Sequence, residues 1–290
     1  MLATESSTGA VAESGPDLAA RPRRLSGLRV VEAPHLCPMG SARVSVVIPT
    51  LNEAGNLPHV LERIPRWVHE VLIVDGLSTD GTPQVADEIW QRLNGGVGAP
   101  ALRVVTQTVP GKGAALRSGF AAAEGDIVVM LDADGSTDPA EIPRYVGALL
   151  GGADFAKGSR FLMGGGTSDM PIYRQLGNFG FVLLVRALFG GRYTDLCYGY
   201  NAAWRRCMQQ LDLDCDGFEV ETVMNLRAVA RGLKIVEVPS YESPRVHGVG
   251  HLRTFPDGWR VLKSVFREWF RARVTSPAST EVMLVGSPNP

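Results

Sequence analysis

From Val44 onward, short apolar runs alternate with longer segments of helical periodicity. Four runs are dominated by apolar residues, namely Val44–Pro49, Val71–Asp75, Leu102–Gln107 and Asp126–Asp132. Such runs are typical of strands buried on both faces of a mainly parallel sheet. Between them the pattern predicts helices over Gln84–Leu93, over Gly113–Ala123 and from Asp138-Pro139 to Leu150. This order predicts a Rossmann-like, doubly wound half, which binds ligands where the carboxyl ends of its strands open.

The second half of the chain is less regular. A glycine-rich loop at Gly164–Gly166 leads into a predicted amphipathic helix over Ile172–Phe189. Later elements are expected as a strand over Cys197–Ala203, a helix over Glu219–Arg231, a strand over Lys234–Val238 and a helix over Asp257–Arg273. We therefore predict an α/β protein with a mainly parallel central sheet and flanking helices, folded as one domain.

The two ends of the chain lack sustained apolar periodicity. Residues 1–42 are rich in Ala, Ser, Gly, Pro and Arg without a secretory signal, which predicts a disordered leader, and residues 275–290 are expected to be a loose tail. Met39 is a candidate for the true start of translation. The longest apolar stretch, Phe179–Phe189, is interrupted by Arg186 and falls short of the roughly 20 residues that span a bilayer. No membrane-spanning segment is expected.

Charge and cysteine content narrow the class of function. The 290 residues carry 29 Lys and Arg against 30 Asp and Glu, a net charge of −1, so no broad cationic surface for nucleic acid is expected. The cysteines at 37, 197, 207 and 215 form no C-x-x-C pair and indicate reduced thiols. A cytoplasmic protein is expected.

Acidic residues follow three of the predicted strands. Asp132-Ala133-Asp134 comes directly after Ile127–Leu131, Asp75 ends the second run, and Glu53 lies just beyond the first. Side chains two residues apart on a strand face the same way, so the Asp pair can offer oxygens to a hard divalent cation. Mg²⁺ is usually held by one or two carboxylates together with substrate phosphates. This pattern favours a metal diphosphate site at the strand ends.

A lysine lies between two glycines at Gly111-Lys112-Gly113, just before a predicted helix. The lysine and the backbone donors could bind a nucleotide, and a plain turn explains the glycines equally well. The spacing of a Walker loop is absent.

Taken together, these motifs resemble a known family. Pro49-Thr50-Leu51-Asn52-Glu53, Val74-Asp75, Ser78–Thr82, Gly111–Gly113, Asp132–Asp134 and Gly158-Ser159-Arg160 occur in the order seen in family 2 glycosyltransferases of the GT-A fold. The chain is most similar to the dolichol-phosphate or polyprenyl-phosphate mannosyltransferase branch. The resemblance covers roughly residues 44–254.

The resemblance implies an activity and a set of site residues. It implies an inverting transfer of a sugar from a GDP- or UDP-linked donor to a polyprenyl phosphate, with Mg²⁺ or Mn²⁺ held by Asp132 and Asp134. A donor half at 43–160 and an acceptor half at 161–256 would precede the helix at 257–274. The donor pocket would include Pro49, Leu51, Glu53, Asp75, Lys112 and Ala133 beside the Asp pair.

The chain departs from the branch at two places. Gly76 stands where a second Asp often follows the residue matched by Asp75, which leaves the nucleobase contact open. Val249–Leu252 stands where lipid-dependent relatives commonly have S-K-L, which leaves the acceptor open.

Two kinds of acceptor remain. For a phosphate monoester, which is anionic near neutral pH, the resemblance and guanidinium geometry favour Arg160, Arg174 and Arg245. A soluble hydroxyl acceptor, either a saccharide or a secondary metabolite, would need a base, for which Asp195, Glu219 and Glu221 are the candidates.

Other functions are less well supported by the sequence. A sugar nucleotidyltransferase lacks its basic glycine-rich signature after the first strand, and a non-catalytic nucleotide-sugar binding module leaves the Asp pair and the arginines unexplained. A zinc site at His247 and His251 is disfavoured by the intervening glycines, and Cys197 is expected to be a packing residue. The last helix is basic, amphipathic and rich in Trp, so it either lies in a lipid headgroup layer, as a peripheral membrane contact, or packs on the domain. The oligomeric state is not predicted.

Overall fold

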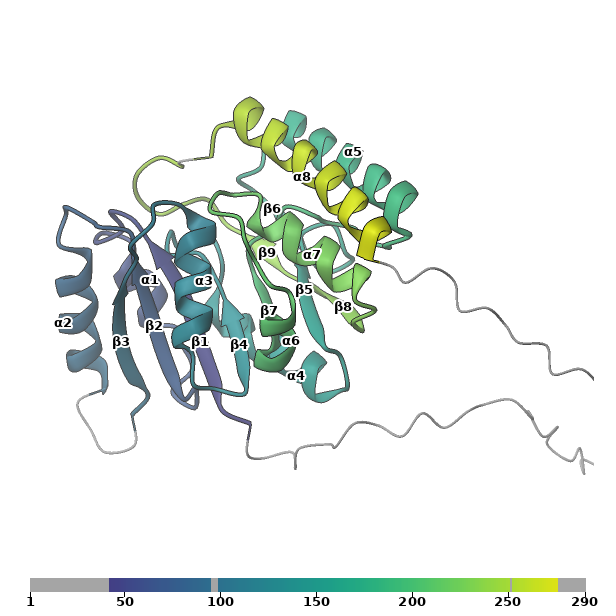
Figure 1. The fold of residues 1–290 in the computed structure, drawn as a ribbon. Coiled ribbons are helices and arrows are strands. Elements are labelled where there is room, and N and C mark those ends of the chain that lie inside the picture. Colours follow the sequence, from purple (N-terminus) through teal and green to yellow (C-terminus); the bar gives the residue numbers. More distant parts are fainter. Residues whose placement is uncertain (1–41, 95–98, 251, 276–290) are drawn as a thin grey trace, which may run out of the picture. The chain divides into compact units, whose positions relative to one another are not determined.

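The fold is built on a central sheet (Figure 1). Within residues 42–94, 99–250 and 252–275, which the computed structural model describes, seven strands pair in the order β3-β2-β1-β4-β7-β5-β8. All neighbours are parallel except β7, which runs antiparallel to β4 and β5. The strands are β1 (Val44–Thr50), β2 (Glu70–Asp75), β3 (Ala101–Thr106), β4 (Ile127–Met130), β5 (Phe155–Ser159), β7 (Asn201–Trp204) and β8 (Ile235–Pro239). The predicted α/β class with a mainly parallel sheet is confirmed.

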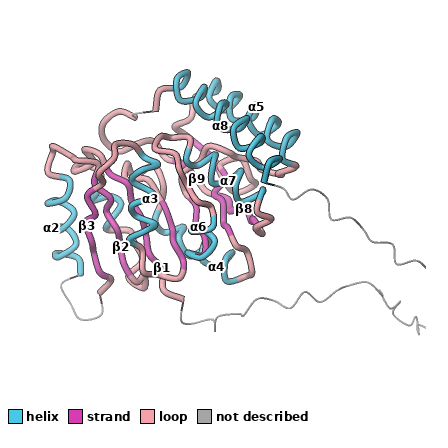
Figure 2. The backbone as a smooth tube through the Cα atoms, in the orientation of Figure 1, coloured by secondary structure: helices cyan, strands magenta, loops and turns pink. Residues whose placement is uncertain are grey.

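Helices cover both faces of this sheet, as Figure 2 shows. One face packs on α1 (Leu57–Leu61), α2 (Thr82–Asn94) and α4 (Ile142–Leu150), and the other on α3 (Lys112–Ala122), α6 (Arg205–Gln210) and α7 (Val220–Ala230). Side chains of β1 alternate between the two cores, with Val46 and Ile48 on the first face and Val47 on the second. Burial on both faces explains why the strand runs are almost continuously apolar.

Two long helices, α5 (Ile172–Phe189) and α8 (Thr254–Thr275), lie side by side beyond the carboxyl ends of the strands (Figure 1). Val185 of α5 and Val265 of α8 share a small third core with Leu226 of α7, which fixes the helix pair to the sheet. Short elements complete the fold, namely η1 (Pro139–Glu141) and the strand pair of β6 (Gly166–Thr167) with β9 (Tyr241–Glu242). No helix in the described residues is both long and apolar enough to cross a bilayer.

The structure corrects some predicted boundaries. The predicted helix over Ile172–Phe189 has the observed bounds, whereas the strand expected from Cys197 begins only at Asn201. Residues 197–200 instead lie beside β5 without being part of a strand. The carbonyl of Tyr198 accepts a hydrogen bond from Lys157 Nζ, and that of Tyr200 accepts one from the backbone N–H of Gly158. Strand β5 was not predicted, because Lys157 and Gly158 interrupt its apolar pattern.

Some predictions lie outside the described residues. These are the disordered leader, apart from residue 42, the alternative start at Met39, most of the loose tail, and Cys37 and His251. The other three cysteines, 197, 207 and 215, are free thiols.

Candidate active site

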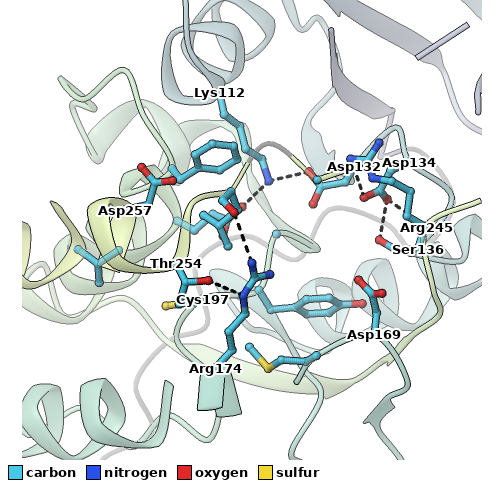
Figure 3. Close-up of a pocket in the computed structure, with 18 of the residues that line it drawn as sticks. Lys112, Asp132, Asp134, Ser136, Asp169, Arg174, Cys197, Arg245, Thr254 and Asp257 are labelled. Carbon is cyan, nitrogen blue, oxygen red and sulfur yellow. Dashed lines mark hydrogen bonds and ion pairs between the residues drawn. The ribbon is translucent and has the colours of Figure 1, made fainter. Parts of the chain in front are cut away.

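A cavity of about 1160 Å³ opens at the carboxyl ends of the parallel strands. Its walls come from the loops after β1 and β4, the start of α3, the segment that follows β9, and the facing sides of α5 and α8. Figure 3 shows the polar residues that gather there. Ligands of open α/β sheets bind at this edge, which makes the cavity the candidate active site.

The Asp132–Asp134 motif follows β4 directly and lines the cavity. Each carboxylate pairs with a cation from a distant part of the chain. Asp132 Oδ1 lies 2.6 Å from Lys112 Nζ, and Asp134 Oδ2 lies 3.2 Å from Arg245 Nη2. Asp134 Oδ1 also accepts hydrogen bonds from the hydroxyl and backbone N–H of Ser136, at 2.6 and 3.0 Å. Both carboxylates are therefore oriented and partly exposed to the cavity.

Lys112 lies between two carboxylates at the start of α3. Its Nζ is 2.6 Å from Asp132 and 2.5 Å from Glu221 at the start of α7. Burial alone would lower the pKa of Lys112, but the two adjacent carboxylates raise it well above its usual value. The ammonium is thus a permanent cation in the cavity wall.

The glycines beside Lys112 are required by packing. Gly111 has φ of 120°, and a Cβ on it would lie 2.2 Å from the carbonyl oxygen of Asp216. The backbone N–H of Gly113 donates to the same carbonyl at 2.8 Å. This close approach of two backbones places the lysine at the cavity.

Arg245 is the second cation at the Asp pair. It lies in the segment between β9 and α8, and its Nη1 is 2.9 Å from Glu53 while its Nη2 reaches Asp134. The same segment is held by the backbone N–H of Val246, which donates to the carbonyl of Asp134 at 3.1 Å, and by two hydrogen bonds between Asn56 and the backbone of His247. The arginine thus connects the ends of β1 and β4.

The donor set suits a divalent cation that arrives with phosphates. The Asp pair supplies two oxygen ligands, and the described residues contain no group of three or more His, Cys, Asp or Glu that could hold a metal alone. One or two carboxylates with substrate phosphates is the usual arrangement for Mg²⁺. Asp132 and Asp134 therefore fit such an ion as partial ligands.

Asp75 ends β2 and is not among the residues that line the cavity. Its Oδ2 accepts from the backbone N–H groups of Leu77 and Ser78, at 3.1 and 3.2 Å, whereas Oδ1 is buried without a partner in the described structure. A buried acceptor without a partner is energetically unfavourable, so a donor from a bound ligand or a water would stabilise it. Its neighbour Gly76 lines the cavity, and a Cβ there would come within 3.1 Å of the Thr50 carbonyl.

The three acceptor-side arginines differ in their surroundings. Arg160 lines the cavity, but its side chain is only 4% exposed and donates to Asp195, Glu242 and the carbonyl of Cys197. Arg174 also lines the cavity, and within the described residues it donates to neutral groups, at 3.0 Å to Thr254 Oγ1 and 3.3 Å to the Leu252 carbonyl. Arg174 is therefore the better placed of these two to meet an anion.

The three candidate bases differ in their burial, their partners and their access to the cavity. Asp195 is fully buried, and although burial would raise its pKa, Arg160 and Lys157 hold the pKa below its usual value. This position does not suit the general base suggested for Asp195, because its oxygens are already bonded to Arg160. Neither Asp195 nor Glu219 belongs to the cavity lining as described. Glu221 lines the cavity but is held by Lys112.

Of the donor residues suggested by the sequence, Pro49, Leu51, Glu53, Lys112 and Ala133 all line the cavity with the Asp pair. Cys197 lines it too, and burial raises the pKa of its thiol to about 12, which suits a packing role. Several lining residues were missed by sequence reasoning, namely Gln107, Ser136, Asp169, Tyr173 and Glu242. Ser136 could have been found as a polar residue two positions after the Asp pair.

Comparison with known proteins identifies the class. A model described as glycosyl transferase family 2 matches residues 45–207. The chain belongs to this family and is a glycosyltransferase, which confirms the family inferred from the motifs.

Two curated relatives and one solved structure are similar to this chain. The polyprenol monophosphomannose synthase of Mycolicibacterium smegmatis is 33% identical over 238 residues, which cover 78% of this chain and 86% of that protein. The undecaprenyl-phosphate mannosyltransferase of Micrococcus luteus is 35% identical over 68% of this chain and 82% of its own length. The solved glucosyl-3-phosphoglycerate synthase from Mycobacterium tuberculosis, in complex with Mn²⁺, UDP and phosphoglyceric acid, superimposes with a TM-score of 0.62 at 25% identity, covering 79% of each chain.

Proposed function

We propose that the protein transfers a hexose, with inversion, from a GDP- or UDP-linked sugar to a polyprenyl phosphate, with Mg²⁺ or Mn²⁺ on the donor diphosphate. The observation that carries this proposal is the Asp132–Asp134 pair after β4, which lines the same cavity as Arg174. The names of the similar polyprenyl-phosphate mannosyltransferases support the acceptor class.

The donor side of the proposal rests on four residues. Asp132 and Asp134 would hold the cation, which when bound neutralises charge that develops on the leaving diphosphate. Lys112 stays protonated beside them and would donate to a phosphate oxygen. Asp75, next to the lining residue Gly76, would accept a hydrogen bond from the nucleobase after a local rearrangement that exposes its buried Oδ1.

The acceptor side needs a cation more than a base. A phosphate monoester is already largely anionic near neutral pH, because its second pKa is about 6. The partners of the Arg174 guanidinium in the part of the chain that the structure describes are neutral, so an anionic oxygen would gain a charge-assisted contact there. Arg245 would also bind the acceptor phosphate, once its guanidinium has released Asp134.

A soluble acceptor is the second candidate. It is supported by the similarity to the phosphoglycerate-bound synthase structure. If the acceptor is a hydroxyl, Glu221 is the cavity carboxylate suggested as its base, after release from Lys112. A nucleotidyltransferase or a binding module without turnover gains no support from the comparisons.

We also infer a peripheral contact with the inner face of a membrane. The exposed apolar residues of α5 include Ile172, Leu176 and Phe179, and those of α8 include Phe266 and Phe270. Exposed basic residues Arg260, Lys263 and Arg267 lie on α8 among them. Such a mixture suits a lipid headgroup layer.

The test is a transfer assay with a panel of GDP- and UDP-sugars and Mg²⁺, with and without polyprenyl phosphate. We expect release of nucleoside diphosphate that depends on the lipid, and its loss on chelation and in Asp134→Asn. The matched control is Asp87→Asn on the exposed face of α2. Release that depends only on a soluble acceptor would favour the second candidate, and full activity of Asp134→Asn would contradict both.

A further inference from the structure

Lys112 bridges one carboxylate of the Asp pair and a glutamate (Figure 3). Its Nζ lies 2.6 Å from Asp132 Oδ1 and 2.5 Å from Glu221 Oε1. Side-chain atoms of all three residues pack against Gly199, at 2.8 to 3.0 Å from the position that a Cβ would take there. The ammonium is therefore shared between two carboxylates at one point of the cavity wall.

Arg245 repeats this arrangement at the other aspartate. Its Nη2 lies 3.2 Å from Asp134 Oδ2, and its Nη1 lies 2.9 Å from Glu53 Oε1. The two cations come from different elements, since Lys112 begins α3 and Arg245 lies between β9 and α8. The same chemical arrangement thus occurs twice, once for each aspartate.

The glutamates are less accessible than the aspartates. The side chain of Asp132 is 30% exposed, and that of Asp134 is 18% exposed. The corresponding values are 9% for Glu221 and 8% for Glu53. An ion that enters the cavity therefore has better access to the aspartates than to the glutamates.

Both glutamates are also stabilised by groups other than the two cations. Asn56 Nδ2 donates to Glu53 Oε2, and the backbone N–H of Glu53 donates to Thr82 Oγ1 at 2.9 Å. Glu221 lies in the first turn of α7, where the helix dipole favours a negative charge. Each glutamate is thus an anchored carboxylate that can keep a cation.

The charge of this cluster suits a divalent ion, but the cations stand in its way. With every group ionised, the four carboxylates and the two cations carry a formal net charge of −2. One oxygen of each aspartate contacts a cation, which would repel an ion bound at the same carboxylate. Movement of both cations toward the glutamates would remove this repulsion.

We propose that Glu53 and Glu221 are positioning residues that retain the two cations when the Asp pair binds a divalent ion. This inference rests on the proposed function and adds how the chain's own cations leave the metal ligands. A cation that moves to its glutamate stays paired, whereas a buried charge without a partner is strongly destabilising. The two glutamates thereby set the affinity of the site for the metal.

The experiment is a double-mutant cycle on Lys112 and Glu221. It measures the metal gain, which we define as the factor by which Mn²⁺ raises the affinity for UDP or GDP in calorimetry. We expect Glu221→Gln to reduce the metal gain about fivefold, because Asp132 is then the carboxylate that keeps Lys112 paired. In the Lys112→Met background, the same substitution should change the metal gain less than about twofold.

Asp169→Asn is the matched control for the loss of one negative charge. Asp169 lines the cavity and forms no ion pair with the residues drawn in Figure 3, so its substitution releases no cation there. The metal gain of this variant should stay within about twofold of wild type, because charges exposed to solvent are screened. Circular dichroism verifies that all variants are folded.

The second cation gives an independent arm of the test. Glu53→Gln, made in wild type and in the Arg245→Met background, should show the same pattern, so the proposal stays testable if a Glu221 variant fails to fold.

A glutamate substitution that lowers the metal gain by the same factor in both backgrounds, or by no factor at all, would overturn the proposal for that pair. A metal gain in wild type would then leave the proposed function standing. No metal gain in wild type would reject both the metal in the proposed function and the role of the glutamates.

Discussion

The donor and acceptor sides of the cavity are built in different ways. On the donor side, Asp75 ends β2, and Glu53 and the Asp132–Asp134 pair follow β1 and β4, so the parallel topology alone brings them to one edge. On the acceptor side, Arg160 depends on Asp195 and Glu242, and Arg174 depends on the start of α8. The first side is fixed by strand order and the second by long-range side-chain pairing, so substitutions should affect the two sides differently.

The largest expected effect is on stability, at the acceptor wall. In the Arg160→Met variant, Asp195 keeps a buried charge without its main partner, since both side chains are almost fully buried in the native protein. Breaking a buried pair costs about 3–5 kcal/mol. Arg63→Met breaks an exposed pair with Asp138 and should cost about 0–1 kcal/mol. Urea unfolding of both variants checks this, and equal losses would contradict the structural role of Arg160.

The same pair predicts a pH dependence. Because the folded pKa of Asp195 is lowered, its contribution to the free energy of unfolding is fully present above the unfolded carboxyl pKa of about 3.9. That contribution is lost as the pH falls through the lower folded pKa. We expect Asp195→Asn to flatten the acid limb of stability relative to wild type. An acid limb as steep as that of wild type would show that another group dominates.

The next effect is on turnover, at the donor side. Lys112→Met removes the cation between Asp132 and Glu221, so kcat/KM should fall about 100-fold, in the range of one lost charged contact at a developing anion. Lys234→Met, at an exposed position, is the control. Because the pKa of Lys112 is raised, Lys112 should stay protonated from roughly pH 6 to 9. Its titration should therefore not lower the wild-type rate in this range. Steady-state kinetics across pH measures both.

A smaller effect is expected at Arg174. Arg174→Ala should raise KM for the phosphate acceptor about tenfold, the size of one charge-assisted contact, with little change in KM for the donor. Arg144→Ala on the exposed face of α4 is the control. An increase in the KM for the donor alone would show that Arg174 binds the donor and not the acceptor.

The smallest effect concerns the membrane face. Phe270→Ser removes one exposed ring from α8 and should weaken binding to anionic vesicles about threefold in a flotation assay. Trp67→Ser, an exposed aromatic residue outside α5 and α8, should leave binding unchanged. Equal binding of Phe270→Ser and wild type would argue that this face has no lipid contact.

The sequence predicted the fold and the site best where a local pattern of residues determines the structure. Continuous apolar runs predicted β1, β2 and β4, and with them the edge at which Asp132 and Asp134 lie. Strand β5 escaped because Lys157 is buried in it and held by backbone carbonyls rather than by an apolar pattern.

Side-chain partners could not be predicted from spacing. Arg245 and Glu53 are 192 residues apart, and only the fold shows that they meet. Arg160 and Asp195 were each matched to the acceptor site by resemblance, but nothing in the sequence shows that they pair with each other.

The central claim is that Asp132 and Asp134 hold a divalent ion against the donor diphosphate. The most direct measurement is calorimetric binding of GDP and UDP with and without Mn²⁺, for wild type and for the Asp132→Asn, Asp134→Asn double variant. We predict that Mn²⁺ raises wild-type affinity for one of these nucleotides about tenfold or more and leaves the affinity of the double variant unchanged. The same gain in both proteins would contradict the account.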